Sequence, residues 1–408
     1  MLQAAPTLED SHFHGDRVGY ALRSLALAET RGELTPADRS YIIEFVQELR
    51  ACNGTTISRQ NKITSHLCNW RQYIGPFDQN SIGDLIAGAN EIRSGKHRTK
   101  GTPLKTNTII DYIKILKQFY GWMNDQGYTN IPEKRLAKIS APPKPQMAKT
   151  AADILTTGEI TAFLSACTTS RDRAIFSLLY EAGLRSGEIA TLTWRQLSFD
   201  EYGAVINVDF KTNKPRYVRL VMSTEALAAW RRDYPLQQTP DALVFVNRLQ
   251  HPLTHAAITK QMRVIALRAG ITRHLTLHLF RHSRITHLIR EGIPIPVVGM
   301  LFWGDPTARM LRTYLHLVNT DVDRALLAHY GLADRQMAEP ERVEVHDCPR
   351  CHTIAGPGAR FCGRCGCELT EEAARSIEAS KGFLADDAAI QKEEMRRMIL
   401  EMKELGEI

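Results

Sequence analysis

A histidine and an arginine three residues apart, His278 and Arg281, form a pattern that suits phosphate binding. The segment that carries them begins at Thr276, a good helix cap, and repeats apolar residues at helical spacing from Leu277 to Ile289. Residues at i and i+3 share a helix face, so the imidazole and the guanidinium should project together. Arginine offers forked donors that match phosphate oxygens, and histidine exchanges protons near neutral pH. The pair therefore favours chemistry on a phosphodiester.

The same helix carries His282, and two histidines at i and i+4 can also hold a metal. No third ligand is evident nearby in the sequence, which makes the metal interpretation the weaker one. After Gly292, two short helices are expected at 294–301 and 307–314, and the second delivers Tyr314. A tyrosine considered alone is most often a core or interface residue.

The elements that must position these residues fall into two parts. Residues 1–34 show no sustained period, and helical periodicity then predicts helices that start near 35, 56, 82 and 107. The proline-rich run 141–145 predicts an extended linker. After it the pattern is mixed, with a strand pair at 204–210 and 216–221, a short strand at 243–246, and helices at 157–167, 170–182, 187–192, 224–233 and 254–269.

Arg185 lies where two of these helices meet. Gly183 ends the first helix and Ser186 can cap the next, which places Arg185 in a tight junction. A simple charge interaction with the helix end is the alternative for an arginine at this position.

Composition and charge narrow the class of protein. The 408 residues are 43% hydrophobic and 24% charged, which is ordinary for a folded protein of two or three domains. No apolar run reaches about 18 residues and no secretion signal is evident, so a cytoplasmic location without a membrane partner is expected. The net charge is +7; residues 371–408 hold ten acidic and six basic side chains (−4), leaving +11 on the rest. Excess positive charge favours nucleic acid or an anionic membrane as partner.

A basic loop follows the third helix. The segment 94–105 carries glycines and several basic side chains, of which Lys96, Arg98, Lys100 and Lys105 are the candidate DNA contacts. Such a loop can lie along a phosphate backbone. A solvated loop without a ligand is an equally open interpretation.

Cysteines cluster near the end of the chain as Cys348-x2-Cys351-x10-Cys362-x2-Cys365. Two Cys-x-x-Cys pairs at this spacing predict a zinc ribbon, in which four thiolates close a tetrahedral structural site. Cys367 is a spare thiol or a substitute ligand, and a redox dithiol is the alternative. Beyond the ribbon, apolar residues at helical spacing predict an amphipathic helix that packs on a neighbouring copy or on its own domain, namely Met395, Met398, Ile399, Met402 and Leu405.

Taken together, four segments resemble the tyrosine recombinase, or phage integrase, family. They are Glu-Ala-Gly-Leu-Arg-Ser-Gly-Glu-Ile (181–189), Lys-Thr-Asn-Lys-Pro-Arg (211–216), His-Leu-Phe-Arg-His (278–282) and the late Tyr314. The resemblance covers about residues 35–330. It implies a site-specific recombinase that cuts and rejoins double-stranded DNA through a covalent 3'-phosphotyrosine, needs neither metal nor ATP for catalysis, and forms a synaptic tetramer on DNA.

The expected fold is therefore mainly α with a small antiparallel β-sheet. The domains would be an N-terminal segment (1–34), an all-helical domain similar to the family's core-binding domain (35–140), a linker (141–150), a mixed α/β catalytic domain (151–335), a zinc ribbon (345–369) and a C-terminal amphipathic helix (370–408).

The resemblance also implies residue roles. Arg185 matches the first catalytic arginine, His278 and Arg281 match the His-x-x-Arg box, Tyr314 matches the nucleophile, and Lys211 matches the family's lysine, a general acid for the 5'-oxygen. Two guanidiniums suit the extra negative charge of a pentavalent phosphorane.

The resemblance assigns the supporting residues less definitely. Lys214 rivals Lys211 because the turn alignment can slip, and Glu188 matches a position that supports the first arginine. His282 stays a candidate support residue.

The sequence departs from the family at Trp303-Gly304-Asp305. The usual pattern here is Leu-Gly-His, with tryptophan as an alternative to the histidine, so Asp305 occupies the histidine slot. Either Asp305 points away or bonds Arg281 or His278, or Trp303 fills the slot.

Two other functions share these features. A non-catalytic DNA-binding regulator could keep the fold and the ribbon, and Asp305 is the feature that favours it. An enzyme of the type IB topoisomerase kind would use the same chemistry without a defined site.

Overall fold

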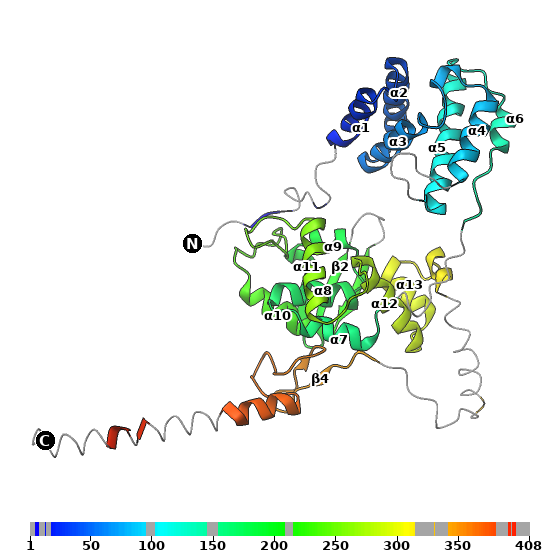
Figure 1. Ribbon diagram of the computed structural model, residues 1–408. Coiled ribbons are helices and arrows are strands. Elements are labelled where there is room, and N and C mark those ends of the chain that lie inside the picture. The colour runs from blue at the N-terminus through cyan, green and yellow to red at the C-terminus, as the bar shows by residue number, and fades with distance from the viewer. Residues whose placement is uncertain are drawn as a thin grey trace, which may run out of the picture. The chain divides into compact units, whose positions relative to one another are not determined.

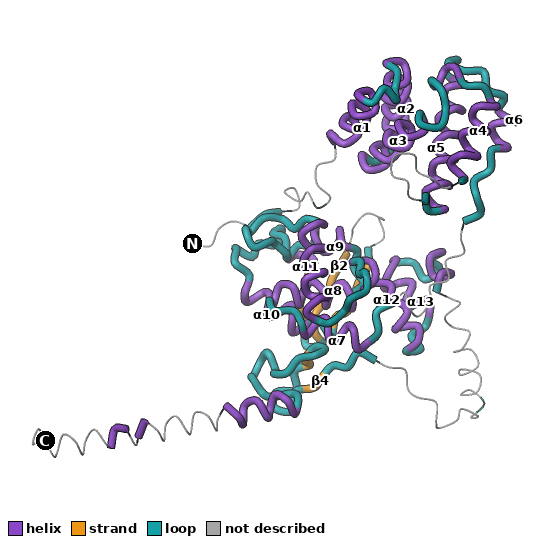
Figure 2. Tube along the Cα trace, viewed as in Figure 1, coloured by secondary structure: helices purple, strands orange, loops and turns teal. Residues whose placement is uncertain are grey.

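The computed structural model describes residues 5–7, 13, 18–94, 103–144, 154–208, 215–314, 330, 342–380, 391–392 and 394–396. The chain divides into two compact units, His14–Met147 and Met1–Phe13 with Ala148–Ile408. The first unit is helical and the second combines helices with a small sheet (Figures 1 and 2). The prediction of a mainly α fold with a small antiparallel sheet is confirmed.

The helical unit is held by an aromatic core. Phe119 lies edge-on to both Phe45 and Phe77. Thr35 and Asp38 cap the second helix through a reciprocal pair of side-chain to backbone hydrogen bonds. The elements are α1 (Val18–Thr30), α2 (Pro36–Asn53), α3 (Ile57–Trp70), α4 (Ile82–Arg93), α5 (Thr106–Asp125) and α6 (Glu133–Lys138), with a 3₁₀ turn at Phe77–Gln79.

The mixed unit is built around the sheet β1-β2-β3, in which each neighbouring pair is antiparallel. Its strands are β1 (Leu197–Asp200), β2 (Gly203–Val208) and β3 (Arg216–Leu220). Its helices are α7 (Thr157–Ser165), α8 (Ser170–Glu181), α9 (Ser186–Ala190), α10 (Thr224–Asp233), α11 (His255–Arg268), α12 (Leu277–Arg290) and α13 (Ile295–Trp303), with 3₁₀ segments η3 (Trp194–Gln196) and η4 (Arg309–Thr313).

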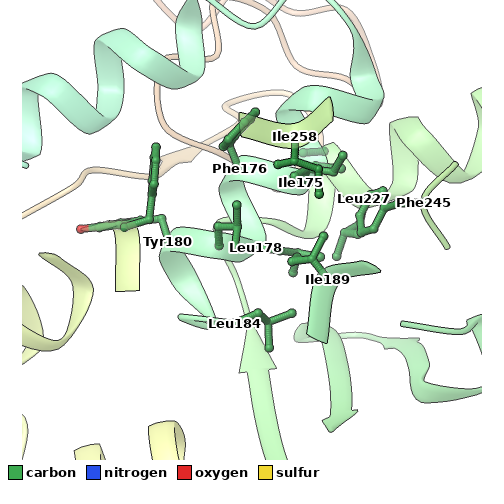
Figure 3. Packing of buried hydrophobic residues seen from close by; sticks show 14 of the residues in the cluster. Ile175, Phe176, Leu178, Tyr180, Leu184, Ile189, Leu227, Phe245 and Ile258 are labelled. Atoms are coloured by element: carbon green, nitrogen blue, oxygen red, sulfur yellow. The ribbon is translucent and has the colours of Figure 1, made fainter. Parts of the chain in front are cut away.

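Helix α8 lies at the centre of this unit. Its side chains from Ala174 to Tyr180 are all buried, which is the pattern of a helix surrounded by others. Figure 3 shows Ile175, Phe176 and Leu178 among apolar residues from α9, α10 and α11. The buried helix therefore fixes the position of the segment that follows it, which contains Arg185.

The beginning of the chain also belongs to the mixed unit. The Pro6 carbonyl accepts a hydrogen bond from Leu243 N at 2.9 Å, and Thr7 forms a β-bridge with Ala242. Phe13 is buried in the mixed unit's hydrophobic core.

Some elements differ from the sequence prediction. Helix α1 lies within residues 1–34, where no element was predicted, and strand β1 was also missed. Residues 243–246 do not form a strand but make isolated bridges, Leu243 with Thr193 and Val246 with Pro252. The segment 307–314 is not an α-helix, because its helical residues, Arg309–Thr313, form a 3₁₀ helix.

The cysteine segment forms a small separate sheet, in which β4 (His346–Asp347) pairs with β5 (Ile354–Ala355). Residues 371–380 that follow are helical. Met395 of the predicted tail stripe is exposed, and the other four stripe residues lie outside the described part of the chain. Among the described helices, none has both the length and the apolar character that crossing a membrane requires.

Candidate active site

Arg185 stands at the N-cap of α9, where a reciprocal contact with Glu188 fixes it. Its backbone N–H and its Nη1 each donate to the Glu188 carboxylate at 2.8 Å. Glu188 is buried, whereas the Arg185 side chain keeps 31% of its surface exposed. Arg185 is thus held by its partner but still reaches solvent, as a phosphate ligand must.

Arg216 is a third arginine in this cluster that sequence reasoning did not single out. It is 3% exposed, donates to Glu188, and its Nη1 donates to the Leu301 and Phe302 carbonyls at 3.1 Å. Strand periodicity contained the signal, because Arg216 shares the inward face of β3 with Val218 and Leu220.

Arg281 is buried at 2% exposure and bridges two distant segments. Its Nη1 donates to the Gly183 carbonyl and its Nη2 to the Phe302 carbonyl. The guanidinium carbon lies 5.1 Å from the ring centroids of both Phe302 and Trp303. Burial, helped by the charges of Arg216 and Arg185, lowers the pKa of Arg281 to about 9. It therefore remains charged at neutral pH.

Tyr314 follows η4 and is 1% exposed. Its hydroxyl forms a hydrogen bond with His282 Nδ1, and its ring centroid lies 6.4 Å from that of Trp303. Burial raises the pKa of the Tyr314 hydroxyl above its usual value, so the group is a neutral phenol at neutral pH and must lose a proton to act as a nucleophile.

His278 lies one turn before His282 on α12 and is exposed. The two ring centroids are 4.2 Å apart and nearly perpendicular. The structure thus brings His282, which sequence reasoning treated only as a support residue, into contact with the candidate nucleophile. His278 packs against His282.

Asp305 makes a local turn. Its Oδ1 accepts hydrogen bonds from the Thr307 N–H at 2.9 Å and from the Thr307 hydroxyl at 2.8 Å. Trp303, two residues earlier, is the residue of this segment whose ring faces Arg281.

The structure describes only one of the six candidate basic residues of the two loops. Lys211, Lys214, Lys96, Arg98 and Lys100 lie outside the described residues. Lys105 is described and occupies the N-cap position of α5 in the helical unit.

The four predicted metal ligands come together. The sulfur atoms of Cys348, Cys351, Cys362 and Cys365 lie within 4.8 Å of one another. The Cys348–Cys365 and Cys351–Cys362 sulfur distances are 3.5 and 3.6 Å. Four thiolates about 2.3 Å from a zinc ion would be separated by roughly 3.8 Å, so the donor set fits that metal. Hydrogen bonds with Thr353 lower the pKa of Cys351 to about 6, which favours the thiolate form that binds metals.

Comparison with known proteins identifies the family. A model of the phage integrase family matches residues 153–320. Tyrosine recombinase XerD of Lacticaseibacillus casei is 31% identical over 290 residues, which cover 68% of this chain and 94% of that protein. Tyrosine recombinase XerC of Xanthomonas campestris is 24% identical over 346 residues, which cover 83% of this chain and 99% of the relative. The chain belongs to the tyrosine recombinase, or phage integrase, family, and this membership supports site-specific recombination as its activity.

Solved structures agree on the fold. XerH site-specific recombinase bound to its palindromic difH substrate in a post-cleavage complex matches with a TM-score of 0.53 at 18% identity, over 81% of this chain and all of the other. Lambda integrase bound to DNA matches with the same TM-score at 16% identity, over 68% of this chain and 95% of the other. The family model ends at residue 320, before the cysteine ribbon.

Proposed function

We propose that this protein is a site-specific DNA recombinase that breaks and rejoins double-stranded DNA through a covalent 3'-phosphotyrosine at Tyr314. The observation that carries the proposal is a cluster of three guanidiniums, Arg185, Arg216 and Arg281, around one carboxylate, Glu188. These four side chains carry a net charge of about +2, counted at one unit each. A phosphodiester placed against the partly exposed Arg185 supplies the missing negative charge.

Each residue then has a role in strand cleavage. Arg185 binds the non-bridging oxygens directly, and Arg281 adds positive potential and fixes the surrounding backbone. Tyr314 attacks phosphorus as its proton passes to His282, with which it is already hydrogen-bonded. The P–O5' bond breaks, and Lys211, or its rival Lys214, protonates the departing oxygen. His278 orients the His282 ring.

Rejoining follows by reversal of these steps. A DNA 5'-hydroxyl attacks the phosphotyrosine, and His282 returns the proton to Tyr314 as the tyrosine leaves. The bond energy is conserved in the covalent intermediate, so no ATP or catalytic metal is needed.

Other features extend this proposal. The basic loop with Lys96, Arg98, Lys100 and Lys105 contacts the DNA backbone, and four copies assemble on two sites. One crystallised lambda integrase forms a tetramer on a Holliday junction. The cysteine ribbon holds one structural zinc, which supplies folding energy rather than chemistry. The protein acts in the cytoplasm.

The test is covalent trapping. The binding site is first selected from random duplexes, and the protein is then incubated with a nicked suicide duplex of that site. We expect a denaturation-resistant adduct that is lost in Tyr314→Phe and retained in Tyr330→Phe, since Tyr330 is 71% exposed. If the protein binds the selected site but forms no covalent adduct with it, a non-catalytic regulator would be favoured. Relaxation of supercoiled DNA that lacks the site, at the same rate as supercoiled DNA that carries it, would favour a topoisomerase.

A further inference from the structure

One carboxylate of the catalytic unit, that of Glu225, binds two loops of the cysteine ribbon. Glu225, in the first turn of α10, accepts a hydrogen bond from Gly356 N–H at 3.1 Å on one oxygen and from Gly363 N–H at 2.9 Å on the other. Gly363 lies between the metal-ligand candidates Cys362 and Cys365. Two separate loops of the ribbon therefore converge on one side chain.

The fit around Glu225 is close. A Cβ on Gly356 would lie 2.6 Å from the Met222 carbonyl oxygen, and one on Gly363 would lie 2.5 Å from the Glu225 carboxylate. Arg173 of α8 adds a further contact, donating to the Pro357 carbonyl at 3.3 Å. Real Cβ atoms do not approach this closely, so the interface uses glycines where backbone must meet backbone or carboxylate.

The turn at residues 221–223, which the ribbon contacts, is linked by hydrogen bonds to the end of α8, two residues before Gly183 of the candidate active site. Val221, Met222 and Ser223 form the turn between β3 and α10, and their N–H groups all donate to Glu181, at 2.7, 2.9 and 2.8 Å. Glu181 is the last residue of α8. Gly183, whose carbonyl accepts from Arg281, comes two residues later.

We propose that the ribbon is a metal-dependent brace of the catalytic unit and that Glu225 couples the two. The inference rests on the proposed zinc site but does not require the proposed catalysis. Four metal–thiolate bonds fix the loops that contain Gly356 and Gly363, so their N–H groups are presented together only in the loaded ribbon. Loss of the metal releases both donors and leaves the Glu225 carboxylate without them.

Coupling of this kind needs a measurement at the turn rather than at the ribbon. Hydrogen exchange of the Val221, Met222 and Ser223 amides, in the full-length protein with and without a zinc chelator, provides it. In the wild type we expect chelation to speed exchange at these amides by about tenfold or more, because the turn loses its support.

The key variant is Glu225→Gln, which keeps the size of the side chain but replaces one acceptor oxygen with a donor. In this variant the three amides should exchange faster even with zinc bound, and chelation should add less than about twofold. Glu201→Gln, on an exposed turn of the same unit, is the matched control and should behave as the wild type.

Two results would overturn the proposal. Chelation could leave exchange at residues 221–223 unchanged while the ribbon's own amides lose protection, in which case the ribbon folds independently of the catalytic unit. Alternatively, Glu225→Gln could respond to chelation as strongly as the wild type. Metal analysis separates both from a failure of the zinc site itself, which would show no zinc in the purified reduced protein.

Discussion

Gly183 and Phe302 are in such close contact that no side chain fits at position 183. A Cβ built on Gly183 would overlap the Phe302 ring, and the residue has a left-handed φ of +53°. The carbonyls of these same two residues accept the hydrogen bonds of Arg281. The contact between Gly183 and Phe302 therefore sets the distance between the two acceptors that hold the buried arginine.

Gly183→Ala should consequently lower the stability of the protein and displace the carbonyls that hold Arg281. We expect a loss of about 1–3 kcal/mol in the free energy of unfolding from overpacking, plus about 1 kcal/mol from the left-handed backbone. Denaturant unfolding measures it. Gly270→Ala is the matched control, since Gly270 has a φ of +72° in the same unit but open space around it. Equal losses in the two variants would mean that the contact with Phe302 does not matter.

Glu188 supports the arginine cluster, and its replacement should be costly. Glu188→Gln leaves the buried Arg216 without its counter-charge, so we expect a loss of about 3–5 kcal/mol in the free energy of unfolding. The solvent-screened pair Arg219–Asp200 on the same sheet provides the comparison, and Asp200→Asn should cost much less than Glu188→Gln. Similar losses in Glu188→Gln and Asp200→Asn would show that burial of the Glu188–Arg216 pair does not increase its contribution to the free energy of unfolding.

Local patterns in the sequence predicted much of this architecture. Helical period and caps placed α10 at its observed bounds and most other helices within a few residues. The residues at i and i+3, His278 and Arg281, do lie on one helix, and the cysteine spacing correctly predicted that four sulfurs converge. These features depend on residues close in sequence or on a spacing rule.

The missed features depend on contacts between distant segments. Arg281 was expected to project together with His278, but Arg281 is buried against the Gly183 and Phe302 carbonyls, 98 and 21 residues away, whereas His278 is exposed. Sequence reasoning did not single out Glu225, because the two glycine donors that its carboxylate binds lie 131 and 138 residues later in the chain. No local period encodes which carbonyl or carboxylate a distant donor will meet.

Tyr314 should make the free energy of unfolding depend on pH in the alkaline range. Burial raises its folded-state pKa above the unfolded value of about 10, so the folded state binds the phenol proton more tightly. This contribution is present below pH about 10 and is lost as pH rises toward the folded pKa. Tyr314→Phe should therefore flatten the fall in unfolding free energy above pH about 10, measured by denaturant titrations. Tyr202→Phe, at a residue 69% exposed, should leave the slope unchanged; a Tyr314→Phe slope equal to wild type would contradict the burial argument.

The segment that departs from the family pattern gives the sharpest test of the site. The Trp303 ring lies 5.1 Å from the Arg281 guanidinium, whereas Asp305 accepts from Thr307 within its own turn. Trp303→Ala removes a wall of the arginine's pocket, so we expect adduct formation to fall by about tenfold or more. Asp305→Asn keeps an acceptor for the turn and should change the rate by less than about threefold. Rates are measured on the suicide duplex with protein confirmed to be folded. A large loss in Asp305→Asn with a small one in Trp303→Ala would instead assign the histidine slot to Asp305.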